Sequence, residues 1–370
     1  MNEMEYRKLS DCAEFRSERT TKINVKTYIT TENMIKDKGG ISVSNTLPNI
    51  KTASAYKPSD ILLSNIRPYF KKIWYSNRFG SCSNDVLVIS PHNNINPKFL
   101  FYVLSDNNFF NYATVTSKGT KMPRGTQSAI MKYLVPKIDI LKQKKIADIL
   151  TAYDNLIKNN NKRIKRLEQM AENLYKEWFV RFRFPGHEDV EFENGLPKEW
   201  EYTKLERLAN ISTGKCNRED AEEDGAYPLF DRSQEIKRSN VWLNDCEAII
   251  VPGEGTNFIP RYYNGKFNLH QRCYCVEPLK KGMGFFLYQT LMMYRIYFLY
   301  VATGATVPSL RLNNFNDFKV LLPKEELCFQ YNEIAEKMNN EILLLKNKNE
   351  LLAKQRDLLL PRLMSGKLEV

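Results

Sequence analysis

Two heptad patterns constrain the fold of this 370-residue chain more than any other feature. Apolar side chains recur at alternating steps of four and three between residues 146 and 178, and again between residues 335 and 363. A 3.5-residue repeat keeps one stripe of a helix facing a partner helix, so this spacing predicts a coiled coil. The seam positions are Ile146, Leu150, Ile157, Asn160, Ile164, Leu167, Leu174, Ile342, Leu345, Asn349, Leu352 and Leu359.

Each pattern has one asparagine near its middle, Asn160 in the first and Asn349 in the second. A buried asparagine lowers the stability of a coiled coil but fixes which residues face each other, so we expect these two to align. The alternative is that each helix only covers the core of its own domain. The strict 3.5-residue repeat argues against that alternative, because a helix packed on a single globule usually follows a period of 3.6.

The order of short segments around these helices repeats once along the chain. "YRKLSD" at 6–11 returns as "YTKLER" at 202–207, and "SKGTKMP" at 117–123 returns as "ATGATVP" at 302–308. Because such matches keep the same order throughout, the sequence predicts an internal duplication. In each copy, β-rich runs alternate with Gly- and Asn-rich turns before a more helical segment, which is typical of an α+β domain.

Together these patterns predict an α+β chain with two similar domains and two long helices that form an antiparallel coiled coil. The first domain is expected at 1–141, the central helix at 142–183, a linker and the second domain at 184–323, and the C-terminal helix at 324–370. An antiparallel pair would hold the two domains at opposite ends. We therefore expect the helices to act as a spacer.

The charge of the chain favours an anionic partner. Its net charge is +12, and the basic excess is concentrated in residues 1–141, with 20 Lys and Arg against 11 Asp and Glu, and in residues 142–183, with 11 against 5. Nucleic acid is the first candidate, although a basic surface that only maintains solubility would have the same sign. Charge alone leaves both interpretations open.

The cellular compartment is suggested by the cysteines. None of the seven forms a C-x-x-C pair, and the chain opens without a signal-peptide pattern, so a cytosolic protein with free thiols is expected. The apolar run 285–302 contains Gln289 and Arg295. We therefore expect this run to form a buried helix rather than a membrane span.

The sequence gives little support for catalysis. "VPGEGTNF" at 251–258 lacks the lysine and the spacing of a phosphate-binding loop. His270, Cys273 and Cys275 would alternate between the two faces of a strand, so they are not expected to converge on a metal ion. No cofactor or metal is expected on this chain itself.

Basic and amide side chains on the loops of both copies suit DNA binding. Arg, Asn and Gln can make bidentate contacts with base edges, whereas Lys more often meets phosphate. Each residue taken alone is more often a solvated loop residue, but their occurrence at matching places in both copies favours DNA. In the first copy the candidates are Asn65, Arg67, Lys71, Lys72, Ser83, Asn84, Lys118, Lys121 and Arg124. In the second copy they are Asn257, Arg261, His270, Gln271, Arg272, Thr306 and Arg311.

With these residues, the chain resembles the specificity (S) subunit of a type I restriction-modification enzyme over its whole length. The resemblance rests on "QKKIADILTAYDNLI" with "RIKRLEQMAENLYKEWFVRFRFPG" (143–186), "GLPKEW" (195–200), "PGEGT" with "YYNGKFNLHQR" (252–272), and "LLLPRLMSGKLEV" (358–370). It implies a non-catalytic cytoplasmic protein of a prokaryote. Two target-recognition domains would each read half of a bipartite, asymmetric site in double-stranded DNA, and two helices conserved in that family would set the gap.

The resemblance also implies partner subunits. Two methyltransferase (M) subunits would bind S-adenosylmethionine and methylate adenine at N6, and restriction (R) subunits would use ATP and Mg²⁺ to translocate and cleave DNA. A close alternative is the DNA-targeting subunit of a related restriction system that cuts on both sides of its site. Two further alternatives are a self-contained methyltransferase or nuclease, and a coiled-coil scaffold that binds DNA without sequence preference.

Overall fold

The computed structural model describes residues 5–44, 46–365 and 367–368, and the chain falls into two compact units. Unit 1 comprises residues 1–160 and 347–370, and unit 2 comprises residues 161–346. Each unit therefore contains one half of each long helix, whereas the expected four-segment division gives each helix a segment of its own. That division stays a prediction, and its outermost residues (1–4, 366 and 369–370) lie outside the described part of the chain.

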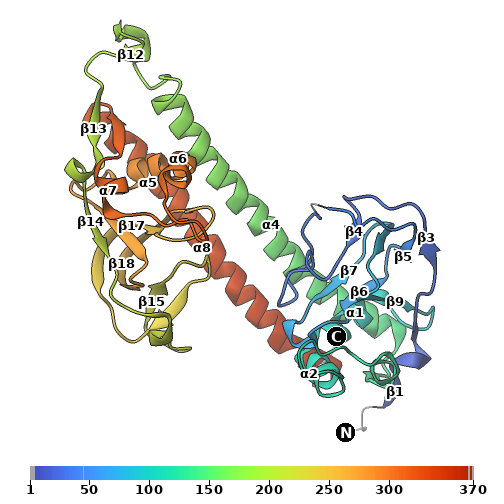
Figure 1. The fold of residues 1–370 in the computed structure, drawn as a ribbon. Coiled ribbons are helices and arrows are strands. Elements are labelled where there is room, and N and C mark those ends of the chain that lie inside the picture. Colours follow the sequence, from blue (N-terminus) through green and yellow to red (C-terminus); the bar gives the residue numbers. More distant parts are fainter. Residues whose placement is uncertain (1–4, 45, 366, 369–370) are drawn as a thin grey trace. The chain divides into compact units, whose positions relative to one another are not determined.

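The two long helices are α4 (Ile140–Phe179) and α8 (Glu325–Met364), and they pair in opposite directions (Figure 1). In unit 1, Asn160 Nδ2 donates to Asn349 Oδ1 at 2.8 Å, and Arg356 Nη1 donates to Asp154 Oδ1 at 2.5 Å. As the residue number falls from 160 to 154 along α4, the number of the contacting residue on α8 rises from 349 to 356. This confirms the predicted antiparallel pairing within unit 1, with the two asparagines aligned.

Unit 2 shows the same pairing between the other halves of the helices. Ile164 packs against Ile342 and Leu345, and Arg163 Nη2 donates to Glu341 Oε1 at 2.8 Å. An apolar seam with an ion pair at its edge is the arrangement that a heptad pattern produces.

The structure buries the predicted seam to different degrees along its length. The buried positions are Ile146, Leu150, Asn160, Ile164, Ile342 and Leu345. The half-buried positions are Ile157, Leu167, Leu174, Asn349, Leu352 and Leu359. Near the end of α8, Leu360 and Leu363 are more deeply buried than Leu359, because this end of the helix packs on the globular core of unit 1 as well as on α4.

The globular part of unit 1 contains a two-stranded pairing and two four-stranded sheets. The first sheet has the order β2-β9-β6-β7, the second has the order β3-β5-β8-β4, and β1 pairs with β10. The strands are β1 (Tyr6–Lys8), β2 (Ala13–Phe15), β3 (Arg19–Thr20), β4 (Tyr28–Ile29), β5 (Ala53–Tyr56), β6 (Ile61–Ser64), β7 (Ile73–Tyr75), β8 (Gly80–Cys82), β9 (Val86–Pro91) and β10 (Leu134–Pro136). The short helices are α1 (Pro97–Ser105), α2 (Asn107–Val115) and α3 (Gln127–Ile130).

Unit 2 repeats this topology. Strands β14-β19-β17-β18 follow the order of β2-β9-β6-β7, and β13 pairs with β20 as β1 pairs with β10. In unit 2 the sheet continues through β15 and β16, and the parallel pairing of β15 with β18 corresponds to that of β4 with β8. The shared order confirms the predicted duplication and the α+β class of both domains.

The elements of unit 2 begin after α4 with the two-stranded pairing of β11 and β12. The strands are β11 (Phe192–Glu193), β12 (Leu196–Pro197), β13 (Glu201–Lys204), β14 (Ala209–Thr213), β15 (Tyr227–Phe230), β16 (Lys237–Ser239), β17 (Asn244–Pro252), β18 (Arg261–Leu269), β19 (Cys273–Pro278) and β20 (Lys319–Leu322). The short helices are α5 (Gly284–Met293), α6 (Arg295–Val301) and α7 (Leu312–Asn316).

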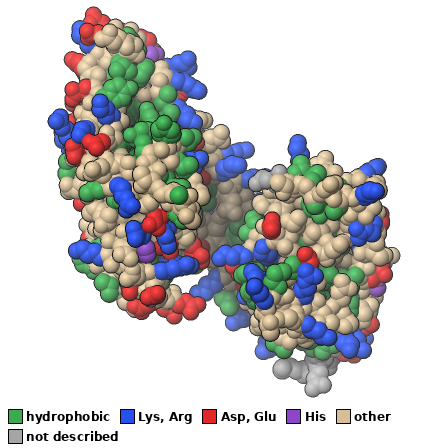
Figure 2. All heavy atoms as spheres, viewed as in Figure 1, with side chains coloured by type: hydrophobic (Ala, Val, Ile, Leu, Met, Phe, Trp, Pro, Cys, Tyr) green, Lys and Arg blue, Asp and Glu red, His purple; other side chains and the backbone are tan. Residues whose placement is uncertain are grey.

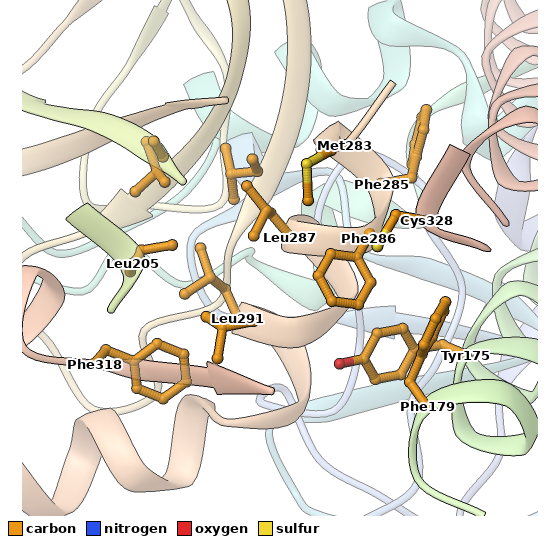
Figure 3. Close-up of a cluster of buried hydrophobic side chains, with 14 of the residues drawn as sticks. Tyr175, Phe179, Leu205, Met283, Phe285, Phe286, Leu287, Leu291, Phe318 and Cys328 are labelled. Carbon is orange, nitrogen blue, oxygen red and sulfur yellow. The ribbon is translucent and has the colours of Figure 1, made fainter. Parts of the chain in front are cut away.

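The aromatic end of α4 belongs to the core of unit 2. Figure 3 shows Tyr175 and Phe179 beside Phe286 of α5, and the rings of Phe179 and Phe286 lie 4.9 Å apart between centroids. Tyr175 Oη also forms a buried hydrogen bond with Thr290 Oγ1 at 2.8 Å. The long helices therefore do both things that the sequence suggested as alternatives, since they pair with each other and also cover the domain cores.

The apolar run 285–302 forms two helices, so the expectation of one buried helix is wrong for its second half. The chain leaves the helical conformation at Tyr294 (φ −89°, ψ 11°), and α6 then exposes 75% of Ile296 and 88% of Tyr300. Among the described residues, no helix has both the length and the apolar character that a membrane span requires.

Candidate nucleic-acid interface

Three segments meet at one edge of the β2-β9-β6-β7 sheet of unit 1. They are residues 64–72 after β6, residues 83–85 before β9, and residues 117–125 before α3, and we call them the recognition loops of unit 1. These segments contain every candidate DNA-binding residue that the sequence indicated in the first copy.

Backbone hydrogen bonds join the recognition loops of unit 1. Asn65 N donates to Asp85 O at 2.8 Å, and Gly125 N donates to Asn65 O at 3.0 Å. Lys118 and Arg124 exchange two backbone bonds of 2.9 Å, which close the third loop into a tight hairpin. The loops are therefore one hydrogen-bonded assembly rather than three independent segments.

Unit 2 has an equivalent set of loops, residues 252–261, 270–272 and 303–311, which we call the recognition loops of unit 2. Gly253 N donates to Arg272 O at 2.7 Å, and Leu310 N donates to Gly253 O at 2.8 Å. Thr303 and Ser309 exchange backbone bonds of 2.9 and 2.7 Å. Each of these bonds has a counterpart in unit 1.

The shared bonds establish which residues correspond between the units. Asp85 corresponds to Arg272, because each accepts the backbone bond from the loop that follows the equivalent strand. Arg124 corresponds to Ser309, since each closes its hairpin. The two units therefore have the same loop backbone but carry different side chains on it.

Lys72, just before β7, and Arg261, at the start of β18, both turn inward. Lys72 Nζ donates to Thr31 O at 2.5 Å, and Arg261 Nη2 donates to Asp231 O at 2.5 Å. Arg261 Nη1 also donates to Ser233 O at 2.8 Å, and its guanidinium lies 4.9 Å from the Phe230 ring centroid. Burial lowers the pKa of both cations. In this structure each binds the turn that follows β4 or β15.

The first recognition loop of unit 1 contains backbone strain. Arg67 and Lys71 both have φ of 51°, in the left-handed region, on either side of the 3₁₀ turn Pro68–Phe70. Such residues cost of order 1–3 kcal/mol each and often mark functional loops. The Arg67 guanidinium lies 5.9 Å from the Phe70 ring centroid, and Lys71 Nζ donates to Asn107 Oδ1 at 2.9 Å.

The remaining candidates of unit 1 lie on or near its surface. Arg124 Nη2 forms an ion pair with Asp85 Oδ1 at 3.1 Å, with both side chains partly exposed. Asn84 Oδ1 accepts from Arg19 Nη1 at 3.4 Å. Lys118 and Lys121 are exposed, while Asn65 and Ser83 are half-buried.

In unit 2 a carboxylate lies between two arginines from different segments. Glu254 Oε2 accepts from Arg232 Nη1 at 2.5 Å, and Glu254 Oε1 lies 3.4 Å from Arg272 Nη1. The Glu254 side chain is only 18% exposed, against 46% for Arg232 and 53% for Arg272. The mostly buried carboxylate thus contacts two arginines whose side chains remain about half exposed to solvent.

His270 supports this group from behind. Its Nδ1 accepts from Arg272 N at 3.0 Å, and its backbone N donates to Phe230 O at 3.0 Å. Burial, and then the positive charge of Arg232, lower the pKa of His270, which favours the neutral ring. His270 therefore lies under the turn rather than at the surface.

The other candidates of unit 2 are exposed. Gln271 Nε2 donates to Asn217 Oδ1 at 2.6 Å. Asn257, Thr306 and Arg311 are solvent-accessible on the first and third recognition loops. The structure thus brings the predicted residues to one edge of each domain, but Lys72, Arg261 and His270 face inward there.

Two arginines at these sites were missed from the sequence. Arg232 follows β15, and the charged run "DRSQEIK" at 231–237 was a signal that could have identified it. Arg19 reaches Asn84 across 65 residues and also donates to Thr52 Oγ1 at 3.3 Å. No local pattern identifies Arg19, because its position depends on long-range strand pairing.

The charges differ between the two units. Figure 2 shows Lys and Arg side chains exposed on both, with Asp and Glu side chains gathered toward both ends of unit 2. Among residues 5–44, 46–365 and 367–368, no group of three or more His, Cys, Asp or Glu side chains is placed to hold a metal ion. The recognition loops therefore present hydrogen-bond donors and acceptors that suit a polar partner.

Comparison with known proteins identifies the family. A family model described as "Type I restriction modification DNA specificity domain" matches residues 1–169 and again residues 197–354. The type I restriction enzyme MjaIX specificity subunit of Methanocaldococcus jannaschii is 23% identical over 308 residues, which cover 76% of this chain and 71% of that protein. The EcoDI specificity subunit of Escherichia coli is 33% identical over 144 residues, which cover 39% of this chain and 31% of that protein.

A solved structure shares the fold. The S subunit of a type I restriction-modification system from M. genitalium superposes with a TM-score of 0.59 at 14% identity, covering 98% of this chain and 97% of that one. The two stretches matched by the family model make up most of the chain and correspond to its two structural copies. This protein therefore belongs to the type I restriction modification DNA specificity domain family and contains that domain twice.

Proposed function

We propose that this chain is the DNA-recognition subunit of a type I restriction-modification complex, and that each unit reads one half of a bipartite, asymmetric site. The observation that supports this most strongly is the pair of recognition-loop sets with matching backbone bonds and different side chains. Two domains that dock on the same kind of duplex need the same backbone frame. They need different side chains if the two halves of the site differ in sequence.

The long helices set the gap between the half-sites in this proposal. Each has 40 residues and is about 60 Å long at the α-helical rise, which exceeds one turn of duplex DNA at about 34 Å. The aligned asparagine pair, Asn160 with Asn349, fixes the register of the two helices. A fixed register gives the site a fixed gap.

Exposed apolar side chains on the helices offer a docking surface for methyltransferase subunits. On the part of α8 that belongs to unit 1, Leu351 and Leu358 are 61% and 60% exposed and lie seven residues apart. This is the heptad spacing of a coiled-coil seam, here on the outside of an existing pair. The surface suits further helices, and we assign it to two M subunits.

The chemistry of the assembled complex belongs to the partners. S-adenosylmethionine binds to the M subunits, which methylate adenine at N6, and ATP and Mg²⁺ serve the R subunits. This chain contributes the choice of DNA sequence and the placement of the M subunits.

The test is to map modified adenines in DNA from cells that express this chain with its M partner. The expected result is one motif with two short constant halves separated by a gap of constant length. A motif with a single half, or methylation without sequence preference, would contradict the proposal.

The docking surface has its own test. Leu351→Asp should abolish co-purification of the M subunit, because it places a charge in an apolar seam. Lys354→Asp changes an exposed residue one turn further along the same helix and serves as the control. Equal retention of the M subunit by the two variants would exclude this surface as the docking site.

A further inference from the structure

The group formed by Arg232, Glu254 and Arg272 differs from an ordinary surface ion pair in how it is held. The Glu254 side chain is only 18% exposed, and its carboxylate contacts both guanidinium groups. Its backbone is fixed, because Glu254 and Ser309 form a β-bridge between two recognition loops. An arginine held in this way loses little conformational freedom when it binds a ligand.

The segment that carries Arg232 is equally constrained. The preceding residue, Asp231, accepts from Ser233 Oγ at 2.6 Å and from Lys237 Nζ at 2.6 Å. Arg261 binds the backbone carbonyls on either side of Arg232, at Asp231 and Ser233. Hydrogen bonds from these side chains therefore hold the turn on both sides of Arg232.

We infer that Arg232 and Arg272 are specificity-determining residues that read guanine in the half-site of unit 2, and that Glu254 is their positioning residue. The inference rests on the proposed function and deepens it by naming the base-reading group. A guanidinium group held in place can donate two parallel hydrogen bonds to O6 and N7 of guanine in the major groove. Both arginine side chains remain about half exposed while they contact Glu254, which leaves them accessible for this.

The corresponding loop positions of unit 1 carry different side chains, and this difference supports the inference. At the position of Glu254, unit 1 has Ile66, whose backbone forms the equivalent bridge to Arg124. The carboxylate of unit 1 is instead Asp85, at the position of Arg272, and it pairs with Arg124. Both units thus present an arginine–carboxylate pair at the same edge, built from different positions of the shared loop backbone, as two readers of different sequences require.

The experiment measures the recognition of each base pair separately. Once the site of the wild-type complex is known from adenine mapping, duplexes with one base pair changed compete for binding to complexes of the wild type, Arg232→Lys and Glu254→Gln. Arg232→Lys keeps the charge but loses the fork geometry. It should reduce discrimination at one G·C pair of the unit 2 half-site by about 5- to 150-fold.

Glu254→Gln should weaken discrimination at that same pair to a smaller extent, because it keeps the shape of the side chain but removes the anion. Neither variant should alter the half-site of unit 1. Glu191→Gln, which removes an exposed ion pair with Lys198 in the linker, is the matched control and should change nothing. The melting temperature of each variant shows whether it folds.

The outcomes separate this inference from the proposed function. If the wild type discriminates every base pair of a two-part site and Arg232→Lys does so equally well, Arg232 contacts phosphate or nothing, and the inference is wrong while the function stands. If the wild type itself shows no sequence preference, the proposed function fails and the inference fails with it. A loss in both half-sites would assign a general structural role and would also overturn the inference.

Discussion

Two buried amide side chains join the long helices to the domains in an equivalent way. Gln143 Oε1 of α4 accepts from Asn96 N, which precedes α1, at 2.8 Å. Asn332 Oδ1 of α8 accepts from Phe285 N at the start of α5, at 2.9 Å. In each unit, a long helix thereby satisfies a backbone donor at the start of the domain's first helix. These bonds specify how helix and domain meet.

We expect Asn332→Ala to lower the free energy of unfolding by about 1–3 kcal/mol, because it leaves the buried Phe285 N–H without an acceptor. Asn340→Ala makes the same change at an exposed position of the same helix and should have little effect. Urea-induced unfolding followed by circular dichroism measures both. An equally small effect of the two substitutions would show that water replaces the lost acceptor.

Asp231 predicts a dependence of stability on pH. Burial alone would raise the pKa of its carboxyl group, but hydrogen bonds from Lys237 and Ser233 outweigh this and lower the pKa from 3.8 to about 2. A group with a lowered pKa stabilises the folded state above the unfolded pKa, and this stabilisation is lost as the pH falls through the folded pKa. The contribution is about 2 kcal/mol at neutral pH.

Between about pH 5 and pH 2, the wild type should therefore lose about 2 kcal/mol more of its unfolding free energy than Asp231→Asn does. The measurement is the unfolding free energy against pH for the wild type, for this variant and for Asp224→Asn, an exposed acidic control in the same unit. Parallel curves for the wild type and Asp231→Asn would mean that the Lys237 bond does not persist in solution.

Sequence patterns located the recognition loops but not the orientation of each side chain. Lys72 and Arg261 were predicted to meet DNA because of their charge and their loop context. In the structure both bind main-chain carbonyls, because the turn after β4 or β15 passes within reach of the start of β7 or β18. That proximity comes from parallel pairing between strands far apart in the sequence, and no local pattern contains it.

At the scale of elements, the last turns of α8 complete the core of unit 1. Leu360 and Leu363 are buried with Phe99 and Phe109 of the globular part. Arg356 is bound by Asp154 of α4, and Lys38 Nζ reaches Asp357 Oδ2 at 2.9 Å. A segment from the far end of the sequence is therefore a structural part of the first domain.

Leu360→Ala should cost about 2–5 kcal/mol of unfolding free energy, since it opens a cavity in this core. Leu358→Ala, two residues earlier and 60% exposed, should stay within about 0.5 kcal/mol of the wild type. Thermal unfolding of both variants tests the assignment. A large loss for Leu358→Ala in the isolated chain would show that this leucine packs within the protein and is not free for a partner.

The helices were the most predictable elements and the sheets the least. The heptad pattern at 146–178 lies within α4 (Ile140–Phe179), because apolar periodicity is a local property of the sequence. The pairing of the remaining strands could not be predicted. Unit 1 forms a separate β3-β5-β8-β4 sheet, whereas unit 2 extends its main sheet through β15 and β16. That difference depends on which edge strand pairs with which, and short strands leave register weakly specified in sequence.

At the scale of the whole molecule, the continuity of α4 and α8 is what the proposed spacing of the site depends on. Both helices contain residues of both units, with the boundary at residues 160/161 in α4 and 346/347 in α8. The helix pair is held by a different kind of contact on each side of this boundary. On one side it is the Asn160–Asn349 bond, and on the other it is the packing of Ile164 against Ile342 and Leu345. A change of length between these contacts would leave both domain cores intact.

We therefore expect that one extra heptad in each helix, placed between Asn160 and Ile164 in α4 and between Leu345 and Asn349 in α8, changes only the gap of the DNA site. Seven residues add about 10 Å at the helical rise, or about three base pairs at 3.4 Å each. Adenine mapping should show both half-sites unchanged and the gap about three base pairs longer. A heptad in α4 alone breaks the match between the two seams and should abolish methylation. If the paired insertion altered the half-site sequences or left the gap as it was, the helices would not be the element that sets the gap.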